Sequence, residues 1–156
     1  MDNRKANIIL GLIATLFGIV SIFTLFATAF GASDTPGHAS TLGSCFDVMF
    51  GSNERSLLPV PLLITAFMFQ VVAIPVLLIG AIIPGRIGSF GLALGAILLA
   101  VAGVFWLTSP TFFLAINKME PSAENVVLGT GAIITAVFAF VSGLLGLFNA
   151  YRNFKA

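Results

Sequence analysis

Few side chains in this sequence can do chemistry, and three of them fall in one segment. The only histidine is His38, the only cysteine is Cys45, and Asp47 follows closely. A histidine, a thiol and a carboxylate are the components of nucleophilic and acid–base catalysis. An enzyme at the outer membrane interface would need a fold that brings these three side chains together. Cys45 alone is a candidate for an intermolecular disulfide.

Cys45 also closes the run Leu42-Gly43-Ser44-Cys45, which resembles the lipobox of bacterial lipoproteins. A lipobox follows its apolar stretch immediately, whereas the apolar segment before this run ends well upstream. The sequence therefore leaves three states open for Cys45, which are a free thiol, a cross-link and a lipidated residue.

The composition defines the class of protein that must position these residues. Of 156 residues, 58% are apolar and only 8% are charged, and the mean hydropathy is +1.10. A soluble domain averages roughly 45–50% apolar and about 25% charged residues. The composition excludes a soluble domain, a disordered chain and a nucleic-acid binder, and it indicates an integral membrane protein.

The charged residues leave four long stretches without Asp, Glu, Lys or Arg. Each exceeds the roughly 20 residues that a helix needs to cross a membrane, and none alternates like a barrel strand. We therefore expect an all-α membrane protein, an antiparallel bundle of four transmembrane helices forming one domain over residues 1–156. The expected spans are about 7–30, 58–83, 87–108 and 125–150, with outer loops at about 31–56 and 109–124.

The charges outside the spans are sorted by sign. One side of the expected bundle carries Asp2 and five cations, which are Arg4, Lys5, Arg86, Arg152 and Lys155. The other side carries two cations, Arg55 and Lys118, and five acids, Asp34, Asp47, Glu54, Glu120 and Glu124. Because Lys and Arg mark the cytoplasmic side, both termini are expected there, in a multi-pass protein of the plasma membrane.

None of the four spans contains an ionisable residue. Proton relays, voltage sensors and many ion-coupled transporters place such groups inside the bundle, and haem or metal sites need His, Cys or carboxylate ligands. We therefore expect no enzyme, no catalytic residue, no cofactor and no metal. Gln70 is a candidate polar contact between helices or a point on a solute pathway, and Pro75 is expected to kink its helix.

Small residues recur at helical spacing in two spans. Gly88, Gly91 and Gly95 lie in the third span, and Gly143 and Gly146 in the fourth. Small residues on one stripe let helix backbones approach closely, so all five are expected at helix-packing contacts. Those contacts lie either inside one bundle or against another subunit.

Aromatic residues give two further expectations. Trp106 and Tyr151 lie near span ends, which is typical of anchors at the membrane interface. Phe46, Met49 and Phe50 in the first outer loop are spaced i, i+3 and i+4. We expect either a short helix that lies in the interface and buries that face, or a packed loop over the mouth of the bundle.

The layout of four spans, inside termini and a longer first outer loop resembles that of the claudin-like tetraspan proteins. The likeness covers topology alone, because this loop carries Cys45 without a second cysteine and has no tryptophan. Tetraspanins carry a large second outer loop with several cysteines, which this chain lacks. No family follows from the sequence.

Two functions fit these expectations. The first is a small non-enzymatic tetraspan protein that acts through helix and outer-loop surfaces as an accessory subunit, scaffold or adhesion-type module. Its partners would be the lipid bilayer and a membrane protein or a second copy. The alternative is a transporter or channel for a small neutral or apolar solute, with Gln70, Pro75 and the glycine stripe along its pathway.

Overall fold

Four long helices dominate the computed structural model, which describes residues 3–27, 29–35, 38–41, 43–53, 56–117 and 126–155. They are α1 (Asn3–Phe23), α3 (Pro61–Ile82), α4 (Gly85–Leu107) and α6 (Thr130–Lys155). Each is long and apolar enough to cross a membrane. The expectation of a multi-pass helical membrane protein is therefore confirmed at this level.

A helix makes its backbone hydrogen bonds within itself, as a segment in hydrocarbon must. Side-chain hydroxyl groups in these helices also find acceptors there, because they donate to carbonyl groups one turn earlier. Thr15 does so to Gly11 over 2.8 Å, and Ser89 to Gly85 over 3.1 Å. Pro61 begins α3, where its missing N–H costs nothing, and the helix continues through Pro75.

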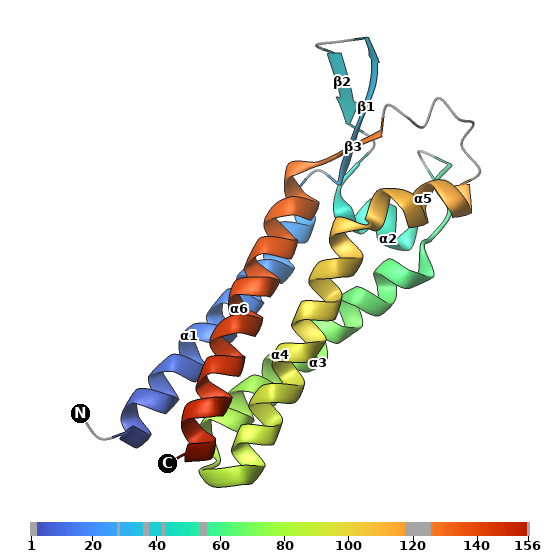
Figure 1. Cartoon of the computed structure of the whole chain (residues 1–156). Helices are drawn as coiled ribbons and strands as arrows, with labels where there is room; N and C mark the ends of the chain where they lie inside the picture. Colours follow the sequence, from blue (N-terminus) through green and yellow to red (C-terminus); the bar gives the residue numbers. More distant parts are fainter. Residues whose placement is uncertain are drawn as a thin grey trace.

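The four long helices pack side by side. Helix α1 lies against α6 and α3, and α4 lies against the same two helices. Figure 1 shows both ends of the chain beside the α3–α4 turn, and the remaining connections at the opposite end of the helices. We call these the cationic end and the sheet end, because the first carries Arg4, Arg86 and Lys155 and the second a small sheet.

Three short strands stand at the sheet end, where no strand was expected. They are β1 (Phe30–Thr35), β2 (His38–Thr41) and β3 (Val126–Leu128), and they form one antiparallel sheet in the order β2-β1-β3. Phe30 pairs with Leu128 and Gly31 pairs with Thr41, so the sheet joins the two connecting segments. Figure 1 shows the β1–β2 hairpin projecting beyond the helices.

The strands also correct two expected boundaries. The first span was expected to reach residue 30, but α1 ends at Phe23 and a single 3-10 turn, η1 (Thr24–Phe26), follows it. The last span was expected from residue 125, but β3 precedes α6. Hydropathy does not distinguish a short apolar strand from helix, so backbone pairing between distant segments decided both boundaries.

Two short helices complete the sheet end. Helix α2 (Cys45–Phe50) packs on η1 and α3, and α5 (Ser109–Asn117) follows α4 after a break at Thr108. The side-chain amide of Asn117 accepts from the Leu58 N–H over 2.8 Å, and it donates to the Leu58 carbonyl over 3.5 Å. The amide thus ties the end of α5 to the segment that enters α3.

The apolar core divides into two clusters of different composition. Large side chains fill the sheet-end cluster, among them Leu25, Met49, Trp106 and Phe113. The cationic-end cluster is built from alanine and leucine: Ala73, Leu77, Ala81, Leu92, Leu99, Ala139 and Ala150. Among the described residues, the cationic-end cluster therefore has no buried aromatic ring, whereas the sheet-end cluster has Trp106 and Phe113.

Candidate functional site

Two of the three residues with catalytic potential have structural roles in α2. Ser44 and Asp47 form a capping box: the Asp47 N–H donates to Ser44 Oγ over 3.2 Å, and the Ser44 N–H donates to Asp47 Oδ2 over 3.0 Å. Cys45 is the first residue of that helix, and His38 begins β2, paired with Thr35 of β1. The Asp47 carboxylate thus accepts a backbone hydrogen bond at the N-terminus of α2.

The thiol of Cys45 lies in the sheet-end core and is fully buried. Burial raises its pKa from the ordinary value of 9.0 to about 12. A thiolate is the reactive form in disulfide exchange and acylation, so both the burial and the high pKa oppose such chemistry at this position. An intermolecular cross-link would require α2 to leave its place on η1 and α3.

Gln70 lies at the junction of three long helices. It is fully buried in α3, and its Nε2 donates to Ser21 Oγ on α1 over 3.1 Å. Its Oε1 accepts from the indole Nε1 of Trp106 on α4 over 3.2 Å. The Ser21 hydroxyl in turn donates to the Gly18 carbonyl over 2.7 Å. The two ends of the amide therefore join α1 and α4 through α3.

Trp106 is the member of this network that the sequence analysis misplaced. It was expected to anchor the protein at the membrane interface, but its side chain is fully buried. An indole N–H in an apolar interior needs an acceptor, and Gln70 is the only glutamine in the chain. From these two facts the hydrogen bond between Trp106 and Gln70 could have been predicted. Tyr151, the other expected anchor, is exposed near the end of α6.

Further polar contacts tie α1 and the η1 turn that follows it to α6. Thr24 and Thr135 share a hydrogen bond of 2.7 Å between their hydroxyl oxygens. Ser142 donates to the Ala14 carbonyl over 2.6 Å, and Asn149 Nδ2 donates to the Asn7 carbonyl over 2.8 Å. These buried polar groups are thus contacts between helices.

Two buried amide oxygens near the cationic end have no hydrogen-bond donor. They are the Oδ1 atoms of Asn7 on α1 and of Asn149 on α6. A buried polar atom without a partner costs about 1–3 kcal/mol, so this contact is less well satisfied than the Gln70 network. Asn153 nearby donates to the Ile83 carbonyl over 3.3 Å.

The glycines that the sequence singled out on α4 all face α3. A Cβ on Gly95 would lie 2.8 Å from the Leu77 side chain, and one on Gly88 would collide with the Ile83 carbonyl. A Cβ on Gly91 would meet the Gly80 Cα at an ordinary 3.4 Å. Gly80 of α3, which packs tightly against α4, was missed because its closeness depends on the facing backbone of Gly88 and Leu92.

The two glycines of α6 lie at its contacts with α4 and α3. A Cβ on Gly143 would lie 3.0 Å from the Ala96 carbonyl oxygen of α4, and one on Gly146 would lie 2.9 Å from the Leu77 side chain of α3 and 3.2 Å from the Ala96 Cβ. The structure therefore brings all five predicted packing glycines to contacts within one chain.

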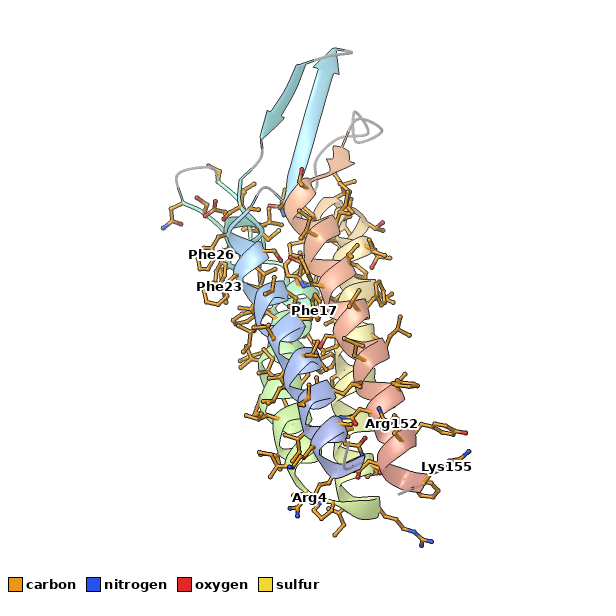
Figure 2. All side chains as sticks on the ribbon, turned by 90° about the vertical axis from the view of Figure 1, so that its left-hand side faces the viewer. Arg4, Phe17, Phe23, Phe26, Arg152 and Lys155 are labelled. Atoms are coloured by element: carbon orange, nitrogen blue, oxygen red, sulfur yellow. The ribbon has the colours of Figure 1, made fainter. Side chains whose placement is uncertain are left out.

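Aromatic rings gather where η1, α2 and α3 meet. Phe46 stacks on Phe26 with ring centroids 4.8 Å apart, and it meets Phe50 at 5.6 Å and Phe67 at 5.7 Å. Met49 of the same helix is buried, whereas Phe50 is exposed. Helix α2 thus packs over the bundle mouth, and Phe50 lies at the edge of that contact, partly exposed and with its ring centroid 6.1 Å from that of Phe67. Figure 2 shows Phe23 and Phe26 at this end of α1.

No family model, curated protein or solved structure matches this chain. Within the described ranges, no three His, Cys, Asp or Glu residues come together as metal ligands.

Proposed function

We propose that this chain is a small tetraspan membrane protein without chemistry of its own, acting through its surfaces as an accessory subunit, scaffold or adhesion-type module. The observation that carries the proposal is the use of Gln70. The Gln70 side chain in α3 is fully buried, and both ends of its amide bond to neighbouring helices. Gln70 therefore holds neighbouring helices of the bundle together.

The rival, a pathway for a neutral solute, needs water or solute at Gln70. A pathway there would have to replace the contacts to Ser21 and Trp106, which already occupy both ends of the Gln70 amide. A vesicle-swelling assay with small uncharged solutes separates the two functions. We expect reconstituted protein to swell no faster than empty vesicles, whereas solute-dependent swelling that Gln70→Leu alters would favour the rival.

Partner contacts, on this proposal, fall on the sheet end. The packing glycines of α4 and α6 are used inside the chain, so they leave no free glycine stripe on those helices for another subunit. The β1–β2 hairpin instead projects beyond the helices, and β2 and β3 are the edge strands of its sheet. Edge strands offer unpaired backbone groups to a partner.

Purification in mild detergent, with the stoichiometry of any partner or second copy, tests this function. The informative variant replaces residues 31–41 with a Gly-Ser linker, and Leu144→Ala on the exposed side of α6 is the control. We expect the linker variant to lose its partner while the emission of buried Trp106 stays unchanged. A monomer that co-purifies with nothing, in wild type and variant alike, contradicts the proposal.

We propose, in addition, that both termini face the cytoplasm in the plasma membrane. All five cations whose side chains are described lie at the cationic end, and Lys and Arg are retained on the cytoplasmic side. Alkaline phosphatase fused after residue 155 is expected to be inactive, and the same enzyme inserted at residues 36–37 is expected to be active. The reverse pattern would overturn the orientation.

A further inference from the structure

The cationic end carries unbalanced positive charge. Its described cations are Arg4 and Lys5 at the start of α1, Arg86 at the start of α4, and Arg152 and Lys155 at the end of α6. No Asp or Glu of the described residues lies at this end. Figure 2 shows Arg4, Arg152 and Lys155 together there. The surface therefore complements an anionic ligand.

Aromatic rings beside the cations keep the charged groups near the helix surface. The guanidinium of Arg86 lies over the Phe154 ring, 5.8 Å from its centroid, and that contact joins α4 to α6. On α6, Arg152 lies over Phe148, and the Lys155 ammonium contacts Tyr151. Contact with a ring face leaves the N–H groups at the edge of a guanidinium free to donate.

Apolar side chains continue from Arg86 along the two helices toward the membrane interior. On α4, exposed Phe90 and Leu94 follow Arg86 at intervals of one turn. On α6, exposed Leu147 precedes Phe154 by about two turns on the same face. Helices α4 and α6 pack against each other, so these positions border one shared surface. A cation at the end of an apolar track matches a lipid with a charged headgroup.

We propose that this surface binds an anionic phospholipid. The phosphate accepts from the guanidinium of Arg86, in the field of the other four cations, and an acyl chain lies along Phe90 and Leu94. A cation near a membrane surface contributes about 1 kcal/mol toward anionic lipid, which corresponds to about fivefold in affinity. The inference depends on insertion in a membrane and is independent of any protein partner.

Native mass spectrometry of the full chain in mild detergent, titrated with phosphatidylglycerol or phosphatidylcholine, tests this site. We expect one phosphatidylglycerol to bind in preference to phosphatidylcholine, and Arg86→Gln to weaken it about fivefold. Lys5→Gln, which removes the same charge from α1, is expected to weaken it no more than about twofold, because a remote cation is screened. Millimolar inorganic phosphate is expected to leave the lipid bound.

Several results would overturn the site. Equal binding of the two lipids would show that the site does not recognise the charge of the headgroup. Equal losses of affinity for Arg86→Gln and Lys5→Gln would show that the lipid responds only to the total positive charge and not to a contact with Arg86. Displacement by inorganic phosphate would mean that the ligand is a free anion. Phe90→Ala separately tests the acyl-chain contact along Phe90 and Leu94. It should weaken the binding of both lipids, and unchanged affinity would contradict that contact. Unchanged Trp106 emission shows that each variant is folded.

Discussion

The two halves of the bundle are held together by different means. Toward the sheet end, large side chains and the Gln70 network occupy the space between helices, and α2 packs over the mouth. Toward the cationic end, glycine and alanine let α3, α4 and α6 meet almost backbone to backbone. A membrane protein gains little from hydrophobic burial between helices, so it depends on close contact or on polar bonds. This chain uses polar bonds in both halves and close backbone contact between α3, α4 and α6 mainly toward the cationic end.

Removal of the largest side chain of the sheet-end half should have the greatest effect. Trp106→Ala removes the indole from a fully buried position and leaves Gln70 Oε1 without a donor. We expect a loss of about 3–5 kcal/mol in the free energy of unfolding, measured by titration with SDS. Trp106→Phe, which keeps most of the volume, should cost clearly less, and equal losses would mean that packing is loose there.

The opposite change, a small increase in size, should matter most in the cationic-end half. A Cβ on Gly80 would lie 2.7 Å from the Leu92 backbone nitrogen and 3.0 Å from the Gly88 carbonyl oxygen, and neither can move aside. We expect Gly80→Ala to cost about 1–3 kcal/mol in the same titration.

Gly91→Ala is the matched control for that substitution. It lies on the facing helix, but its Cβ would have ordinary contacts, the nearest at 3.4 Å. It should therefore be near neutral. If both alanines are tolerated equally, the backbone contact between α3 and α4 is not as close as described.

The polar coupling within the sheet-end half is expected to be smaller. A double-mutant cycle with Gln70→Leu and Trp106→Phe should give an interaction energy of about 0.6–2 kcal/mol. The double variant should be more stable than the sum of the single losses predicts, because each single change leaves a buried group unpaired. Strict additivity would show that the two side chains act independently.

The effect that is smallest near neutral pH concerns Cys45, because it appears only at high pH. Its thiol has a pKa of about 12 in the folded protein and an ordinary value of 9.0. The folded state thus holds the proton over a range in which the unfolded state loses it. The contribution of Cys45 to stability is therefore constant below about pH 9 and falls as the pH rises above it.

Maleimide labelling of Cys45 provides the measurement. Labelling of the folded protein should stay slow at pH 8 and become rapid in SDS. Rapid labelling of the native protein at pH 8 would instead show that Cys45 is accessible and reactive, and so able to form a cross-link. Cys45→Ala serves as the background.

Sequence reasoning predicted the membrane class and the approximate position of each long helix, because charge-free length alone determines them. It placed the ends of α1 and α6 wrongly, since β1 and β3 pair across most of the chain. It found Gly95 and Gly146 from spacing but not Gly80, whose closeness depends on the facing backbone of α4. Contacts between distant segments are not visible in local patterns.

Gln70 illustrates the same limit at the candidate site. The sequence identified it as a polar point in an apolar span and left a helix contact and a solute pathway both open. The choice depends on which groups meet its amide, and these are Ser21 and Trp106, from two other helices. Trp106 in turn was taken as an interfacial anchor because its position near a span end is typical of one.

The central claim is that the interior around Gln70 is closed and holds the helices together. The chain has a single tryptophan, so the indole N–H of Trp106 gives one resonance in a nitrogen-15 spectrum. Transfer of the protein in nanodiscs to deuterated water measures how fast that proton exchanges. The account predicts a signal that persists for hours, because the proton is bonded to a buried amide oxygen. Loss of the signal within the first spectrum would show water reaching Gln70 and would contradict the account.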